Sequence, residues 1–223
     1  VAIMNGGGVR ASIDAGQITL GELLDVQPFG NQLSLVTLTG AQLKEALENG
    51  VSQIETVAGR FAQVSNMRYS FDPSRPVGDR VTGVQIGDGK GGYSALDPAG
   101  SYRVATINFL LTGGDGYTVL AQGTNKLDTG LLDVDVTTDY VVAHSPVNPQ
   151  VEGRIVVSGT LPGAAAPGTR PAQLPNTAGE LSPAWLLAAL SAGAIGAGMR
   201  LRNRAQRAIE LAEAEPVAVD QAE

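Results

Sequence analysis

The chain has no cysteine and a single histidine, His144. Without cysteine it has neither a disulfide framework nor a thiolate that could bind metal or attack a substrate. A hydrolytic centre with two metal ions draws on several His and Asp ligands, because each ion needs several donors. One histidine does not supply such a set, so no metal site or catalytic residue is expected here. We expect His144 to lie at the surface or at a helix end.

Basic side chains are also scarce. The 223 residues hold 15 Lys and Arg against 22 Asp and Glu. Residues 1–158 hold 10 against 16, which gives this part a net charge of −6. Proteins that bind nucleic-acid polymers present clustered positive charge. The composition therefore argues against a nucleic acid polymer as a partner, and each single arginine becomes more informative.

Residues 1–158 alternate short strand-like and helix-like runs with Gly, Asp and Pro turns. This pattern predicts an α+β domain, in which helices flank a mixed β-sheet. The predicted strands cover residues 1–4, 32–38, 67–71, 81–86, 102–107 and 154–157. A last helix is predicted over residues 133–143.

Two helix starts are marked by capping boxes, Thr19 with Glu22 and Thr39 with Gln42. In this arrangement the Thr side chain and the Glu or Gln side chain each accept a backbone N–H of the first turn. Four apolar residues after the second box share one helical face and predict a buried helix: Leu43, Ala46, Leu47 and Val51.

The C-terminal part changes in composition. Residues 159–173, GTLPGAAAPGTRPAQ, predict a linker, because Pro and small residues cannot bury enough apolar area to fold. After LPNTAGE at 174–180, residues 181–199 carry no charge and are long enough, as a helix, to cross a bilayer core of roughly 30 Å. The arginines in 200–223 predict a cytoplasmic tail and an extracellular domain. A buried, alanine-rich core helix is the alternative interpretation of 181–199.

The order of LPNTA, apolar span and basic residues resembles a Gram-positive sortase signal. The resemblance implies cleavage between Thr177 and Ala178, with the Thr177 carbonyl joined to the cell wall; Ala178 stands where the commonest signal has glycine. A plain membrane anchor is the alternative. Either anchor places the domain on the extracellular face. The chain opens directly with the strand-like VAIM and no signal peptide, so we expect a fragment of a surface protein.

Three separated motifs carry the residues best suited to hold a ligand: NGGGVR at 5–10, PFGN at 28–31 and NFLLTGGDGY at 108–117. Phe29 and Phe109 are two of only four phenylalanines, and both sit beside loop signals. Two such rings can sandwich a planar base, a contact that contributes about 1–3 kcal/mol per base in nucleic-acid complexes. Ordinary core residues are the alternative interpretation of both rings.

Polar side chains accompany the two rings in these motifs. Asp115 is flanked by glycines, which let the backbone take positive φ and approach a ligand closely. A plain turn is the alternative for this segment. Arg10 ends the triple-glycine turn, and its planar guanidinium suits phosphate or ribose oxygens.

Together with VEGRI at 151–155, the three motifs resemble the C-terminal domain of the 5′-nucleotidase family, which includes ecto-5′-nucleotidases and UDP-sugar hydrolases. The resemblance covers about residues 1–158. It implies that the two phenylalanines clamp the base and that the aspartate accepts hydrogen bonds from the ribose hydroxyls. It also implies an arginine near the ribose and α-phosphate, and two asparagines near the base or ribose. The substrate-binding residues implied are Asn5, Arg10, Phe29, Asn31, Phe109 and Asp115.

In that family a separate N-terminal domain holds two divalent metal ions and activates water for attack on phosphate. The C-terminal domain binds the nucleoside end and positions the phosphate. The resemblance therefore implies the substrate-specificity domain of a cell-surface 5′-nucleotidase whose metal domain, and one further binding arginine, are missing from this chain. Two alternatives remain open: an anchored nucleoside-binding module without catalysis, and a sibling UDP-sugar hydrolase or 2′,3′-cyclic-nucleotide phosphodiesterase.

Overall fold

The computed structural model describes residues 1–159. Most of the predicted linker (159–173) lies outside this part, as do the LPNTA motif (174–180), the predicted span (181–199) and the basic tail (200–223). Among the helices of residues 1–159, none combines the length and apolar character that a membrane crossing needs. The anchor therefore stays a prediction.

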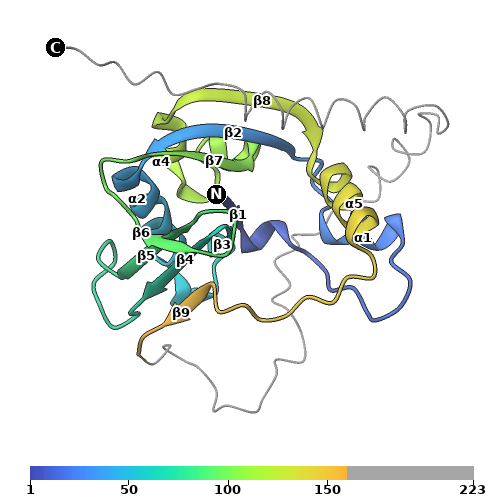
Figure 1. Cartoon of the computed structure of the whole chain (residues 1–223), viewed down its shortest axis with the longest axis horizontal. Coiled ribbons are helices and arrows are strands. Elements are labelled where there is room, and N and C mark those ends of the chain that lie inside the picture. The colour runs from blue at the N-terminus through green and yellow to red at the C-terminus, as the bar shows by residue number, and fades with distance from the viewer. Residues whose placement is uncertain (160–223) are drawn as a thin grey trace. The chain divides into compact units, whose positions relative to one another are not determined.

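Two mixed β-sheets form the framework of the described part (Figure 1). The first has the order β3-β1-β7-β2-β8 and consists of β1 (Ala2–Asn5), β2 (Gln32–Thr39), β3 (Ala62–Ser65), β7 (Ser101–Ile107) and β8 (Thr124–Leu132). The second has the order β6-β5-β4-β9 and consists of β4 (Met67–Phe71), β5 (Val81–Gly87), β6 (Tyr93–Ala95) and β9 (Ile155–Val157). The pairs β1–β7 and β4–β9 are parallel, and the other pairs are antiparallel.

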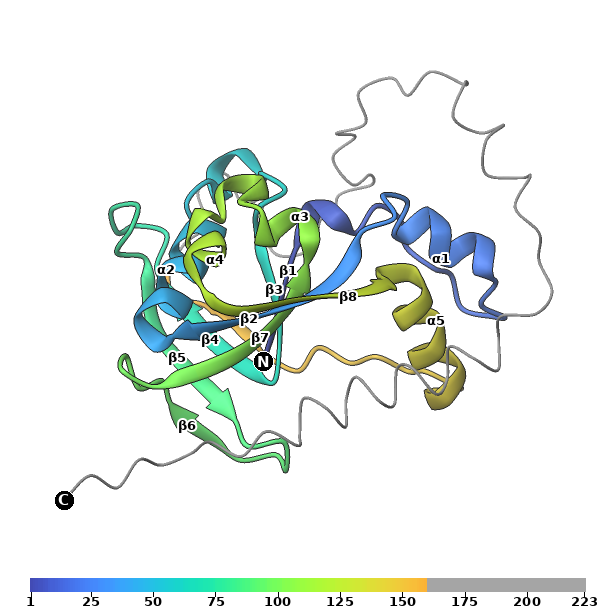
Figure 2. The same cartoon turned by 90° about the horizontal axis from the view of Figure 1, so that it is seen from above.

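Helices flank the sheets, as the sequence predicts for an α+β domain. The α-helices are α1 (Leu20–Val26), α2 (Gly40–Gly50), α3 (Asn108–Leu111), α4 (Thr118–Gln122) and α5 (Asp133–His144). Short 3-10 turns form η1 (Gly6–Gly8), η2 (Ile54–Thr56) and η3 (Gly114–Gly116). Figures 1 and 2 both show α1 and α5 side by side, whereas α2 and α4 contact each other on another side of the domain.

Both predicted capping boxes are present in the structure. Glu22 N donates to Thr19 Oγ1, and Thr19 N donates to Glu22 Oε2, at the start of α1. Thr39 and Gln42 make the same pair of bonds at the start of α2. The four apolar residues predicted to share one face of that helix are all fully buried: Leu43, Ala46, Leu47 and Val51.

The two sheets share one hydrophobic core. Its largest fully buried members come from both sheets and from α2, α3, α4 and the residues beside these helices: Ile3, Val36, Leu38, Leu43, Leu47, Val51, Met67, Tyr69, Phe71, Leu110, Tyr117 and Leu120. Glu48, on α2, is 7% exposed, and its carboxylate accepts the backbone N–H groups of Arg80 and Val81, each at 2.9 Å. These two bonds join α2 to the start of β5, because Arg80 directly precedes that strand and Val81 is its first residue.

Every strand predicted from the sequence is confirmed within one or two residues at each end, and α5 extends one residue beyond the prediction, to His144. His144 is exposed at that helix end, as expected. Strands β3, β6 and β8 were missed. Strand β6 has three residues, and β8 lies at a sheet edge with most of its side chains exposed, so neither shows the apolar alternation that marks a half-buried strand.

The topology brings several chain segments to one edge of the first sheet. The parallel strands β1 and β7 both end there. Strand β3, antiparallel to β1, and strand β2, antiparallel to β7, both begin there. Helix α2 starts at the opposite end of β2, so its last turn comes back toward the same edge. Loops that follow or precede these strands therefore meet at one place, although they are distant in sequence.

Candidate functional site

Asp115 occupies an unusual turn at this edge of the sheet. Its backbone is left-handed, with φ of 53°, between Gly113 at 94° and Gly116 at 81°. Left-handed backbone is uncommon for a residue with a side chain and is frequent at ligand sites. Asn5, at the end of β1, donates from Nδ2 to Asp115 Oδ2 at 2.7 Å across 110 positions of sequence. The first and third motifs therefore meet directly.

Asn5 itself is 4% exposed, and its Oδ1 has no hydrogen-bond partner among the described residues. The resemblance implies that this asparagine lies near the base; the structure joins its amide to the Asp115 carboxylate. One carboxylate oxygen is thus held by a neutral donor, and a buried acceptor stands beside it. Buried polar atoms are normally paired, so such an atom suits a hydrogen-bond donor from a ligand or water.

Phe109 stands above this turn, on α3, directly after β7 ends. Its side chain is 43% exposed. The ring passes so close to Gly114 that a Cβ there would lie 2.6 Å from the ring atoms Cε2 and Cζ. Glycine at position 114 is therefore required for the ring to lie over the turn, and this contact places Phe109 next to Asp115.

Phe29 lies in the second motif and is 56% exposed. The Arg10 guanidinium carbon lies 5.9 Å from the centroid of its ring, and Arg10 N donates to Val26 O at 2.9 Å. The first and second motifs are thus joined as well. Since both rings are exposed, neither is an ordinary core residue. Among the ring contacts within residues 1–159, Phe29 and Phe109 do not pair with each other.

Asn31 differs from the other five predicted residues. Its carbonyl accepts from Asp133 N, at the start of α5, at 2.9 Å. Burial raises the pKa of the Asp133 carboxyl above its ordinary value, and the hydrogen bond that it accepts from Val134 N opposes the rise. The backbone of Asn31 is therefore bonded to the start of α5, while Asn5, Phe109 and Asp115 meet at the sheet edge.

Two further contacts complete the edge. Gln32 N donates to Asn108 Oδ1 at 3.0 Å, which joins the start of β2 to the start of α3. Gly7 N donates to Gly59 O at 2.7 Å, which fixes the triple-glycine turn against the loop before β3. Asn108 opens the third motif, so its presence was visible in the sequence. Gly59 carried no signal, because only the β1–β3 pairing brings it here.

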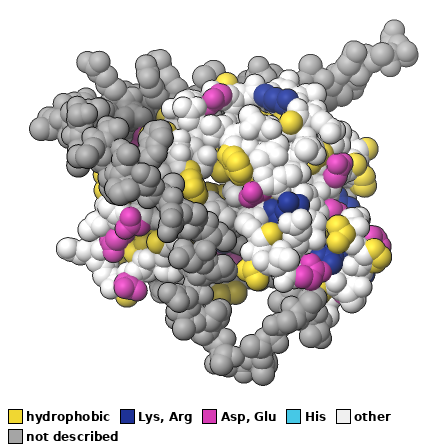
Figure 3. All heavy atoms as spheres, turned by 180° about the vertical axis from the view of Figure 1, so that it is seen from behind, with side chains coloured by type: hydrophobic (Ala, Val, Ile, Leu, Met, Phe, Trp, Pro, Cys, Tyr) yellow, Lys and Arg dark blue, Asp and Glu magenta, His cyan; other side chains and the backbone are white. Residues whose placement is uncertain are grey.

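The described residues offer no ligand set for metal ions. Within residues 1–159, no three His, Cys, Asp or Glu side chains come together as ligands would. The resemblance places the two divalent ions in a separate N-terminal domain, and their site stays a prediction. On the face shown in Figure 3, the basic side chains of the described residues are few and stand among acidic ones, and they do not form a continuous basic field there.

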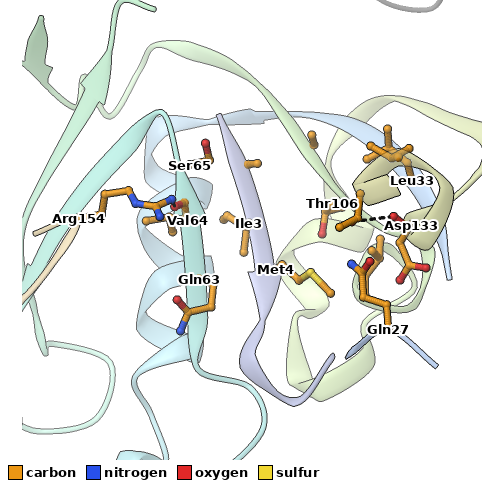
Figure 4. Close-up of a pocket in the computed structure, with 15 residues that line it drawn as sticks. Ile3, Met4, Gln27, Leu33, Gln63, Val64, Ser65, Thr106, Asp133 and Arg154 are labelled. Atoms are coloured by element: carbon orange, nitrogen blue, oxygen red, sulfur yellow. Dashed lines mark hydrogen bonds between the residues drawn. The ribbon is translucent and has the colours of Figure 1, made fainter. Parts of the chain in front are cut away.

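A separate pocket of about 300 Å³ lies against β1, β3 and β7 (Figure 4). Its walls are largely apolar, but three buried polar atoms on one side have no partner among the described residues: Gln27 Oε1, Thr106 Oγ1 and Asp133 Oδ2. Asp115, Phe29 and Phe109 are not among its lining residues. The pocket is therefore distinct from the cluster at the sheet edge.

The sequence model described as "5'-nucleotidase, C-terminal domain" matches residues 1–122. The chain belongs to this family. A Bacillus subtilis relative, "Trifunctional nucleotide phosphoesterase protein YfkN", is 46% identical over 156 residues, or 70% of this chain. "Snake venom 5'-nucleotidase" of Macrovipera lebetinus is 37% identical over 169 residues, or 72% of this chain. The crystal structure of a 5′-nucleotidase precursor from Thermus thermophilus is 49% identical, covers 70% of this chain and superimposes with a TM-score of 0.67.

The chain spans only part of these family members. It covers 11% of the Bacillus protein, 41% of the venom protein and 31% of the Thermus chain. The α+β fold with two mixed sheets agrees with that of the family.

Proposed function

We propose that residues 1–158 bind the nucleoside part of a nucleotide and position its phosphate for hydrolysis by a two-metal centre outside this chain. The observation that carries the proposal is the meeting of three distant motifs at one edge of the first sheet. Asp115 is bonded there by Asn5, Phe109 lies over the same turn, and Phe29 is exposed beside Arg10. Family membership supports a phosphoesterase context.

Each side chain has a chemical role in this proposal. Phe29 and Phe109 are exposed rings on which a planar base stacks. The Asp115 carboxylate accepts hydrogen bonds from ribose hydroxyls, and its charge makes these bonds stronger than neutral ones. Arg10 supplies positive charge for the ribose and the α-phosphate side of the substrate. None of these groups activates water, so the domain contributes binding and orientation rather than the chemical step.

The test pairs a binding measurement with an activity measurement on the 223-residue chain. Calorimetric titration should show saturable but weak binding of adenosine or uridine, and replacement of Asp115 by Ala should weaken it. The chain should release no phosphate from AMP when divalent metal is added, because residues 1–159 hold no metal ligand set. Phosphate release by this chain alone, lost with Asp115→Ala, would overturn the division of labour; absence of any nucleoside binding would overturn the site.

A broader phosphoesterase is the second candidate. The printed name of the Bacillus subtilis relative, a trifunctional nucleotide phosphoesterase, favours it. In that case the protein acts on UDP-sugars or 2′,3′-cyclic nucleotides as well as on 5′-nucleotides. Comparison of turnover for AMP, UDP-glucose and 2′,3′-cyclic AMP by the protein together with its catalytic domain separates the two candidates. A non-catalytic nucleoside-binding module predicts no turnover of any of the three.

We also propose that the protein acts at the extracellular face, held by its C-terminal segment. The sequence order of LPNTA, apolar span and arginines supports this proposal. Sortase processing predicts that the protein fractionates with the cell wall and that Thr177→Ala moves it to the membrane fraction. If the protein stays in the membrane fraction with or without the substitution, the segment is a plain membrane anchor.

A further inference from the structure

A residue of α2 forms a hydrogen bond with the backbone of the turn that carries Asp115. Asn49, in the last turn of that helix, donates from Nδ2 to the backbone carbonyl of Asp115 at 3.2 Å. The two residues are 66 positions apart. The amide also packs directly against the turn, because a Cβ on Gly116 would lie 2.9 Å from Asn49 Oδ1. Asn49 therefore fixes the position of the backbone segment that carries the Asp115 carboxylate.

Arg60 determines which way the Asn49 amide faces. Arg60 Nη1 donates to Asn49 Oδ1 at 3.3 Å and to Ser52 Oγ at 3.2 Å. A guanidinium has only donors, so it pairs with the oxygen of the amide and leaves the nitrogen to face the Asp115 carbonyl. The orientation of one amide is thereby set by a charged neighbour.

The C-terminal side of the turn is bonded to the loop before β3, which contains Arg60. Tyr117 is fully buried, and its hydroxyl donates to Arg60 O at 2.6 Å. Tyr117, which follows η3, is thus joined to Arg60 in the loop before β3, and the side chain and the carbonyl of Arg60 both take part in holding the turn. Left-handed backbone at a residue with a side chain persists only where its surroundings hold it. The contacts of Asn49 and Tyr117 are such surroundings for Asp115.

We propose that Asn49 and Arg60 are positioning residues that set how strongly this domain discriminates ligands with a ribose diol from ligands without one. Neither residue is among those expected to touch the nucleoside; they act through the backbone of Asp115. The proposal rests on the proposed function, because it requires that the Asp115 carboxylate accept hydrogen bonds from the two ribose hydroxyls. It adds the structural reason why that carboxylate is already positioned in the absence of the ligand.

The test compares adenosine with 2′,3′-dideoxyadenosine, which keeps the base and lacks both hydroxyls. Asn49→Asp retains an oxygen for Arg60 but removes the Nδ2 donor to the Asp115 carbonyl. In calorimetric titrations of the 223-residue chain, the wild type should bind adenosine about tenfold or more tightly than the dideoxy compound. The substitution should reduce this ratio by about 3- to 10-fold, as expected for loss of one hydrogen bond, through weaker adenosine binding alone.

Two controls make the result specific. Asn125→Asp makes the same chemical change at an exposed position on β8 and should leave the ratio unchanged. In an Asp115→Ala background, Asn49→Asp should have no further effect on the ratio, because the group through which it acts is gone. If Asn49→Asp does not fold, Arg60→Lys repeats the test, since it keeps the charge and removes the guanidinium whose Nη1 donates to Asn49 Oδ1.

The outcomes separate this inference from the function on which it rests. A wild type that binds adenosine and the dideoxy compound equally overturns both, because no diol is recognised. A wild type that discriminates, with a variant that discriminates equally well, overturns the inference alone. A variant that loses affinity for both ligands by the same factor also overturns it, because Asn49 would then only maintain the fold.

Discussion

Replacement of Phe29 by alanine tests the proposed base slot at its more exposed ring. Loss of a stacked aromatic ring costs about 1–3 kcal/mol per base in nucleic-acid complexes. At 1.4 kcal/mol for each factor of ten, Phe29→Ala should weaken adenosine binding by about 5- to 150-fold. The lower end is expected if Phe109 keeps the base in place alone.

The same substitution should leave the fold intact. Phe29 is 56% exposed, and full burial of a phenylalanine contributes about 1.5–3 kcal/mol, so the partial burial here contributes about 1 kcal/mol to stability. The contact with the Arg10 guanidinium, 5.9 Å from the ring centroid, adds about 0.5–1 kcal/mol at an exposed site. A binding loss much larger than the loss of stability therefore belongs to the ligand rather than to folding.

The assay is calorimetric titration with adenosine, supported by chemical denaturation of each variant. Phe29→Trp should retain binding, because an indole also stacks on a base. Trp185 is the single tryptophan of the chain, so in a Trp185→Phe background the fluorescence comes from the introduced indole alone and should be quenched as adenosine saturates the site. Val142→Ala removes another exposed apolar side chain, 74% exposed on α5, and should change nothing. Unchanged adenosine affinity in a folded Phe29→Ala variant would refute the reasoning.

Three further predictions concern stability. Glu48→Gln removes one of the two carboxylate oxygens that accept from Arg80 N and Val81 N, and urea denaturation should show a loss of about 1–3 kcal/mol in the free energy of unfolding. An unchanged midpoint would contradict a stabilising role of these bonds between α2 and the start of β5. Burial raises the pKa of the Asp133 carboxyl, so the folded chain holds its proton more tightly than the unfolded chain and stability falls as pH rises through the folded-state pKa. Asp133→Asn should therefore melt higher than wild type at neutral pH, and the gap should close as pH falls toward the unfolded value of 3.8; a gap constant with pH would exclude this cause. Gly21→Ala, inside α1 with no atom nearer than 3.8 Å to the new Cβ, should raise stability by about 0.5–1 kcal/mol in thermal melts, and a lower melting temperature would show strain.

Local signals predicted the elements whose cause is local. Helix α2 could be located because its capping box and its apolar face lie within one run of sequence. Strand β8 could not be located, because an edge strand with exposed side chains has no apolar alternation. It is a strand because its backbone pairs with β2, which the sequence pattern does not indicate. Periodicity reports burial on one face, so it is silent where neither face is buried.

The candidate site divides in the same way. Phe29, Phe109 and Asp115 could be selected because each lies in a short motif with glycines beside it. Asn49 and Arg60 could not, because only the return of α2 and the β1–β3 pairing bring them under the Asp115 turn. Asn31 was also selected by its motif, and its carbonyl accepts the backbone N–H of Asp133.

A crystal structure of the 223-residue chain with adenosine bound would show directly where the nucleoside lies. The base should lie between the rings of Phe29 and Phe109, with the ribose hydroxyls within hydrogen-bond distance of the Asp115 carboxylate. Adenosine bound in the pocket beside Gln27 and Asp133 instead, or a sheet edge left empty at saturating adenosine, would contradict the proposed site.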